Sequence, residues 1–226
     1  MTFRLLSFLG AAAAACVILP SCSITQKKGA GLAAYHSYDR PAKLPNNPNE
    51  VSVKVSLSKQ RTYVMEGAEV LLSMPVSVGA PNQRTPTGDF SILNKEEKKR
   101  EKNHGYAFKN GMTKQTGLRD KPAGWSFKGT PLPYWCGFKP DLGFHTGWIK
   151  HYPCTNGCIR MHENLAPKFY RLVKVGTPVH IAYSQPEDAT AGNIPLPPDA
   201  GPLPDYSGTM YTGDGYFRQH KAPEYR

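Results

Sequence analysis

The chain has 226 residues, of which 28 are Lys or Arg and 17 are Asp or Glu, giving a formal net charge of +11 at pH 7. This length suits one enzyme-sized domain beside shorter flanking segments. The positive charge favours acidic partners, such as cell-wall polymers, anionic lipid headgroups or peptide carboxylates. Nucleic acid is the generic alternative for a basic chain, but no motif supports it, and the signs of export described next argue against it.

The first residues have the pattern of an export signal. Arg4 gives a positive start, and the apolar run Leu5–Leu19 is too short for a stable membrane span. We therefore predict that residues 1–21 are a signal peptide.

The signal ends in Leu19–Cys22 (LPSC), which resembles a bacterial lipobox. This resemblance implies that Cys22 is lipidated and that the protein is a membrane-anchored lipoprotein facing the periplasm. Ser23 after the cysteine favours the outer over the inner membrane. An ordinary cleaved signal peptide is the alternative. Residues 22–49, rich in proline and polar residues, are predicted to be the anchor and a tether.

Alternation of apolar and polar residues predicts strands from Val51 onward, beginning with Val51–Leu57. Turn residues separate this run from three further strand patterns, so we expect a mostly β domain built from hairpins. The later strands are expected at 61–65, 69–78 and 89–93, with a short helix at 163–172 and a closing strand at 177–183.

Three segments are less regular. Residues 94–103 are nearly all Lys and Glu, which indicates an exposed helix or a solvated loop inserted in the domain. Residues 105–135 are rich in Gly, Lys and aromatics and are a candidate lid. Residues 184–226 are crowded with Pro, Gly and Tyr and are predicted to be a disordered tail. The aromatic residues of the chain's middle third offer either a stacking face for substrate or ordinary packing: Trp125, Tyr134, Trp135 and Trp148.

Beyond Cys22 the chain has three cysteines: Cys136, Cys154 and Cys158. An odd number in an exported protein leaves one free thiol or an intermolecular bond. The economical hypothesis is a Cys136–Cys154 disulfide with Cys158 free, and the competing pair is Cys154–Cys158. A zinc site is disfavoured, because the spacing of Cys154 and Cys158 offers only half a ligand set.

Cys158 is the candidate nucleophile, because it directly follows a glycine, with a histidine upstream and an arginine two residues downstream. His145 is the candidate base, with His151 as an alternative. Backbone amides around Asn156 and Gly157 are expected to form an oxyanion hole. Arg160 is a fixed cation suited to a carboxylate.

Four segments together resemble the L,D-transpeptidase catalytic domain family (YkuD type): Thr85–Phe90 (TPTGDF), Gly143–His145 (GFH), Thr155–Met161 (TNGCIRM) and Val175–Val179 (VGTPV). The resemblance covers roughly residues 50–183. It implies a mostly β, β-sandwich-like catalytic domain with one or two short helices.

The resemblance also implies site residues. Cys158 matches the family nucleophile and His145 its base, while Gly157, Asn156, Arg160 and Thr146 are candidate oxyanion and substrate-binding residues. The family usually has His-Gly-Thr where this chain has His145-Thr146-Gly147, and a backbone carbonyl there can still orient the imidazole. Asn156 stands where histidine is common, and the shorter gap between His145 and Cys158 implies a trimmed loop over the cleft.

The implied reaction is peptidoglycan cross-linking or wall attachment. Cys158 would form a thioester on a stem tetrapeptide, D-alanine would leave, and an amine would resolve the thioester. The same residues would also suit a carboxypeptidase or endopeptidase that hydrolyses peptidoglycan, and a non-catalytic wall-binding lipoprotein is the remaining alternative. The expected partners are stem peptides and, through the anchor, the membrane; no metal or organic cofactor is implied.

Overall fold

The computed structural model describes residues 28–198, 208–218 and 225. The predicted signal peptide (1–21) and the lipidation site Cys22 lie outside the described residues. No helix in the described part of the chain has the length and apolar character needed to cross a bilayer.

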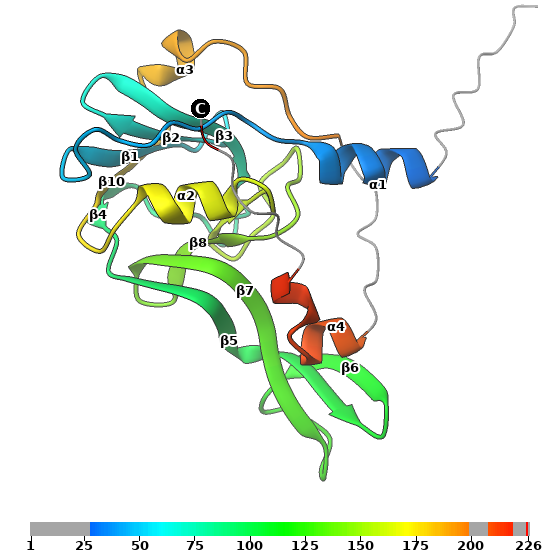
Figure 1. Ribbon diagram of the computed structural model, residues 1–226. Helices are drawn as coiled ribbons and strands as arrows, with labels where there is room; N and C mark the ends of the chain where they lie inside the picture. Colours follow the sequence, from blue (N-terminus) through cyan, green and yellow to red (C-terminus); the bar gives the residue numbers. More distant parts are fainter. Residues whose placement is uncertain (1–27, 199–207, 219–224, 226) are drawn as a thin grey trace, which may run out of the picture.

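The domain is mostly β, as predicted, and its strands form one ten-stranded sheet in the order β4-β10-β1-β2-β3-β9-β8-β7-β5-β6 (Figure 1). The strands are β1 (Val51–Ser56), β2 (Arg61–Glu66), β3 (Glu69–Ser77), β4 (Gly88–Ser91), β5 (Asn94–Lys109), β6 (Met112–Gly117), β7 (Ser126–Lys139), β8 (Leu142–Thr146), β9 (Ile159–Met161) and β10 (Pro178–Ala182). The described helices are α1 (Lys28–Ser37), α2 (Ala166–Leu172), α3 (Glu187–Thr190), α4 (Gly208–Thr212) and the 3-10 turn η1 (Gly215–Arg218).

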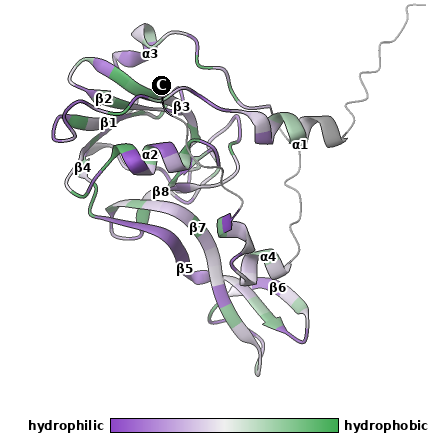
Figure 2. Ribbon diagram, in the orientation of Figure 1, coloured by the Kyte–Doolittle hydropathy of each residue, from purple (hydrophilic) through white to green (hydrophobic). Residues whose placement is uncertain are grey.

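One hydrophobic core joins the two halves of this sheet. In β1 every second side chain, Val51, Val53 and Val55, is buried, which is the alternation that predicted the strand. These valines share a core with Phe144 of β8 and Phe169 of α2. Figure 2 shows the apolar residues concentrated in the strands of this body, whereas the first half of β5 is hydrophilic.

The prediction of a helix or loop for residues 94–103 is wrong, because they form the first part of β5. Their side chains do not favour a strand, so pairing decides the conformation. Lys99 lies opposite Leu132 of β7, and the ammonium of Lys95 donates to the carbonyls of Tyr170 and Val173 at 2.6 and 2.7 Å, at the end of α2. Long-range hydrogen bonds thus override the local charge pattern.

Residues 105–135, the candidate lid, belong to a β-sheet arm made of β5, β6 and β7 that extends away from the body (Figure 1). A register shift between Arg100 and Gly105 interrupts the pairing of β5 with β7. We call residues 105–129, beyond this shift, the arm tip.

The described parts of the predicted tether and tail pack against the domain. Tyr35 of α1 is 2% exposed against Trp148, and its hydroxyl accepts the Ile149 N–H at 3.0 Å. At the other end, Asp188 of α3 accepts hydrogen bonds from Ser56 and Tyr63 at 2.7 and 2.8 Å. These contacts differ from the free tether and disordered tail expected from composition, because both segments carry residues that complete the body.

Candidate active site

The candidate site lies where β8 and β9 run in parallel. His145 is in register with Arg160, and Phe144 is in register with Ile159. Because side chains alternate along a strand, His145 and Arg160 share one face, while Phe144 and Ile159 point to the core. Cys158 lies just before β9, two residues ahead of Arg160, and the charge of Arg160 acts on both the Cys158 thiol and the His145 imidazole.

The imidazole of His145 is oriented by a backbone carbonyl. Its Nδ1 lies 2.8 Å from the carbonyl oxygen of Thr146. Since a carbonyl only accepts, Nδ1 carries the hydrogen and Nε2 keeps its lone pair, as a general base requires. The side chain of Thr146 is buried on the opposite face of β8, in register with Met161, so this residue contributes its carbonyl to the site.

Trp135 of β7 supports the His145 ring from behind. The two rings stack with centroids 6.3 Å apart and planes 21° apart. The indole N–H donates to the side chain of Asn94 at 2.7 Å. Gly143 leaves room for this ring, because a Cβ there would lie 2.8 Å from the indole. Trp135 is 3% exposed and Trp148 9%, so they do not form the aromatic stacking face considered from the sequence.

The His145 imidazole and the Cys158 thiol are both neutral near pH 7. Burial, assisted by the charge of Arg160, lowers the pKa of His145 to about 4 despite the hydrogen bond to Thr146. Burial raises the pKa of Cys158, and the Gly143 backbone and Arg160 oppose this rise only in part. The thiol points to the carbonyl of Asp141, with a sulfur–oxygen distance of 3.7 Å.

Arg160 is held beside both groups and against a second sulfur. Its Nη1 lies 3.8 Å from Sγ of Cys154. Its stem passes over Gly147, where an added Cβ would lie 2.9 Å from Arg160 Cδ. The glycine of the His145-Thr146-Gly147 sequence therefore makes room for this cation.

Thr155 closes the loop that carries Cys158. It is 2% exposed, and its hydroxyl donates to the carbonyl of Cys158 at 2.6 Å and accepts the Gly157 N–H at 3.2 Å. Gly157 has φ +100°, a conformation that favours glycine. In this conformation the Gly157 amide faces the inside of the loop, so it is not directed at an oxyanion. Asn156 is exposed at the tip of the same loop.

A second threonine holds the loop from outside. The Thr85 hydroxyl donates to the carbonyl of Gly157 at 3.0 Å and accepts the Gly79 N–H at 2.9 Å. Thr85 and Thr155 both belong to sequence motifs named above, but the sequence alone did not assign either of them a role. Beside this contact lies a pocket of about 520 Å³, with apolar side chains and Arg84 among its lining residues, and Cys158 does not line it.

Other sequence candidates lie elsewhere. The Nε2 of His151 lies 2.8 Å from the carbonyl of Pro197, so this exposed histidine is engaged outside the site.

Cys136, Cys154 and Cys158 are all free thiols, and the Cys136–Cys154 disulfide is not formed. Cys136 faces the core, where burial raises its pKa to about 12. Among the described residues, no group of three His, Cys, Asp or Glu side chains is placed to hold a metal ion.

We expect Thr155→Val to lower both stability and turnover, because it removes two hydrogen bonds and leaves the Cys158 carbonyl and the Gly157 amide without their partner. The expected cost is about 1–3 kcal/mol in the free energy of unfolding, measured by urea titration, with roughly tenfold slower turnover. The control is Thr87→Val, which changes an exposed threonine of the Thr85–Phe90 segment. Unchanged turnover in Thr155→Val would show that the loop does not need this hydroxyl.

Residues 50–181, more than half of the chain, match the L,D-transpeptidase catalytic domain (YkuD) family. The chain belongs to this family, whose name describes transpeptidases. No curated protein matches the sequence.

Solved structures with similarity to the chain include L,D-transpeptidases from Mycobacterium smegmatis (22% identity, TM-score 0.46, covering 59% of this chain and 58% of that one) and Stackebrandtia nassauensis (21%, 0.45, 72% and 69%). A cysteine-to-serine mutant of the Enterococcus faecium enzyme is also similar (22%, 0.43, 59% and 50%). The chain thus spans between half and about two thirds of the length of these proteins.

Proposed function

We propose that this protein is a peptidoglycan L,D-transpeptidase that uses Cys158 as its nucleophile and His145 as its general base. The observation that supports the proposal is that Arg160, paired with His145 across β8 and β9, acts electrostatically on both His145 and Cys158, within a domain of this family. The tautomer set by Thr146 leaves Nε2 of His145 as the proton acceptor.

The proposed acylation proceeds from a neutral pair. Sγ of Cys158 attacks the carbonyl between the diamino acid of a stem tetrapeptide and its terminal D-alanine, while the thiol proton passes to His145. The imidazolium then gives this proton to the amine of D-alanine, the C–N bond breaks, and a thioester remains. Arg160 is suited to hold a substrate carboxylate near the sulfur.

The second half of the reaction releases the enzyme. The amine of a second stem attacks the thioester carbonyl, His145 accepts a proton from this amine, and the C–S bond breaks. The sulfur recovers its proton from His145. The product is a cross-link between two stems. If a protein supplies the amine, the same step links that protein to the wall.

We further propose that the protein works outside the cytoplasm. The apolar start and the Leu19–Cys22 sequence support export and lipidation of Cys22. The lipid would hold the enzyme at a membrane facing the periplasm, with the outer membrane favoured. Its partners would then be stem peptides and the bilayer surface.

The acylation rate is expected to stay nearly constant between about pH 5 and pH 8. Because the pKa of His145 is lowered to about 4, the base is neutral throughout this range and is protonated only below it. The measurement is the rate of carbapenem capture by Cys158, followed as a mass increase on the intact protein. A loss of rate centred near pH 6.5 would indicate a histidine with an ordinary pKa and contradict this assignment.

Purified tetrapeptide muropeptides test the proposed reaction directly. We expect dimers together with free D-alanine, identified by mass spectrometry. Shortened stems without dimers would identify a hydrolase that uses water as the acceptor. Absence of any product, with wall binding unchanged in Cys158→Ala, would identify a non-catalytic wall-binding protein.

A further inference from the structure

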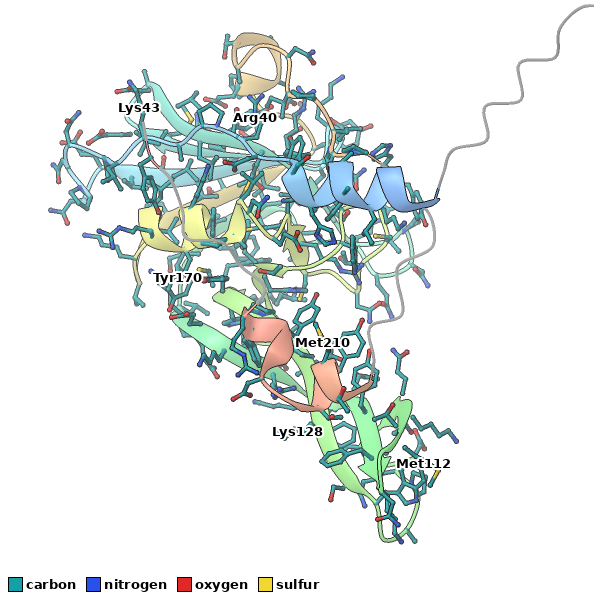
Figure 3. The ribbon with its side chains drawn as sticks, turned by 45° about the vertical axis from the view of Figure 1, so that its right-hand side comes forward. Arg40, Lys43, Met112, Lys128, Tyr170 and Met210 are labelled. Atoms are coloured by element: carbon teal, nitrogen blue, oxygen red, sulfur yellow. The ribbon has the colours of Figure 1, made fainter. Side chains whose placement is uncertain are left out.

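The arm tip is a three-stranded sheet built on β5 and β7, the two longest strands of the described chain. Beyond the register shift, β5 pairs with β6 on one side, from Gly105 to Lys109, and with β7 on the other side, from Gly105 to Phe108. Figure 3 places Met112 at the far end of the arm, where β5 turns into β6. The arm tip therefore has two faces that can be assigned from its register.

One face is covered by the C-terminal helix α4. Tyr106 of β5 stacks on Tyr211 with ring centroids 4.5 Å apart and planes 5° apart. On the same face, Thr113 lies against Gly208, where an added Cβ would be within 1.8 Å of the threonine hydroxyl. Arg100 at the base fastens this segment by donating to the carbonyls of Tyr211 and Gly213 at 2.7 and 2.6 Å.

The opposite face combines lysines with apolar side chains. Lys109 lies opposite Met112, and Ala107 lies opposite both Lys114 and Phe127. Opposed residues in antiparallel strands share a face, so these residues share the face that α4 does not cover. We call Lys109, Met112, Lys114 and Phe127 the lysine face. Its centre is covered by the chain itself: Ala107 is 0% exposed, and in the segment that joins β6 to β7 a Cβ added to Gly124 would lie 3.6 Å from Lys109 Nζ. Met112 is 56% exposed, and both lysines are exposed.

The arm tip as a whole is strongly positive. Residues 105–117 contain no Asp or Glu, and residues 105–130 carry five basic side chains against the single acidic Asp120. The basic residues are Lys109, Lys114, Arg119, Lys121 and Lys128. Trp125, half-buried, stands just before β7 at the same end of the arm.

We propose that the exposed end of the lysine face, with Lys109, Met112 and Lys114, docks on an anionic phospholipid surface. Lysines near such a surface are attracted by its negative potential, and an exposed methionine gains by entering the interfacial layer. Tryptophan is also favoured at this depth. A wall polymer would satisfy the charges but offers no apolar layer for Met112, which is why the bilayer is favoured over the wall. This contact would act independently of any acyl chain on Cys22, and it goes beyond the proposed reaction.

Vesicle flotation tests the docking surface. Every protein compared is the full chain with Cys22→Ser, so that no acyl group contributes to vesicle binding. Residues 1–27 are otherwise identical in all of them. We expect stronger binding to vesicles of phosphatidylcholine with 30% phosphatidylglycerol than to phosphatidylcholine alone. Lys109→Gln with Lys114→Gln should weaken binding to the anionic vesicles by roughly 25-fold, about fivefold for each lysine.

The matched control is Lys59→Gln with Lys174→Gln, which removes the same charge from exposed positions on the body, and it should bind as the parent does. Met112→Ser should weaken binding several-fold without any change in charge. Equal binding by the two double variants, or equal binding to both vesicle types, would overturn the proposal. Loss of binding to isolated peptidoglycan alone, with vesicle binding unchanged, would assign the surface to the wall and also overturn it.

Discussion

Cys158→Ala is expected to reduce turnover of tetrapeptide muropeptides to the uncatalysed level while the protein stays folded. The proposed reaction forms its only covalent intermediate on this sulfur, and removing it leaves no nucleophile for that step. The half-buried side chain is small, so its loss should change the free energy of unfolding by no more than about 1–1.5 kcal/mol. Turnover is followed by release of D-alanine, and folding by thermal denaturation.

Cys154→Ala is the matched control for that variant. It removes a thiol four residues away that also contacts Arg160, at 3.8 Å, but that has no part in the proposed chemistry. We expect it to keep turnover within a few-fold of the parent. If Cys158→Ala retained the parent's turnover, or if Cys154→Ala lost it instead, the assignment of the nucleophile would be wrong.

His145→Asn is expected to slow acylation by about 10²- to 10⁴-fold, the usual contribution of a general base. Asparagine can still donate a hydrogen bond to the Thr146 carbonyl from the position of Nδ1, so the buried site keeps that contact while the base is lost. Carbapenem capture by Cys158 gives the rate.

The pH dependence separates this role from a structural one. Without a base, reaction depends on the small fraction of thiolate, because burial raises the pKa of Cys158. The residual rate should therefore rise about tenfold per pH unit near neutrality, whereas the parent's rate stays flat. His151→Asn, whose histidine faces the Pro197 carbonyl, should behave as the parent does. A flat profile in His145→Asn would show that the imidazole is not the base.

Strands with a clear alternation were predictable from local sequence. Val51, Val53 and Val55 alternate with polar residues, and β1 has the predicted start and nearly the predicted end. The alternation works because one face of the strand meets the core. It does not reveal partners, and the parallel pairing of β1 with β10, from opposite ends of the domain, comes only from the structure.

Segments whose conformation depends on distant partners were not predictable. β5 begins with a Lys/Glu run that has no β preference, and it is a strand because β7 pairs with it. The described N-terminal segment is held by the buried Lys168 ammonium, which contacts the carboxylate of Asp39 at 2.7 and 2.8 Å. The amino-acid composition of these two segments does not indicate either the strand pairing or the ion pair.

The sequence named the candidate site residues but not the residues that support them. It proposed Cys158, His145 and Arg160, and the parallel register of β8 and β9 pairs His145 with Arg160. It did not assign a role to Thr155, whose hydroxyl closes the loop, or to the Trp135 ring behind His145. The number of cysteines suggested a Cys136–Cys154 disulfide. That number carries no information about burial, and in the structure Cys136 is a free thiol that faces the core.

Intact-protein mass spectrometry after mixing the enzyme with a tetrapeptide donor, without acceptor, tests the central claim most directly. We predict an adduct equal to the donor stem minus D-alanine, mapped to Cys158, removed by hydroxylamine and absent in Cys158→Ala. An adduct on another residue, or release of D-alanine without any covalent adduct on rapid quenching, would contradict a Cys158 thioester.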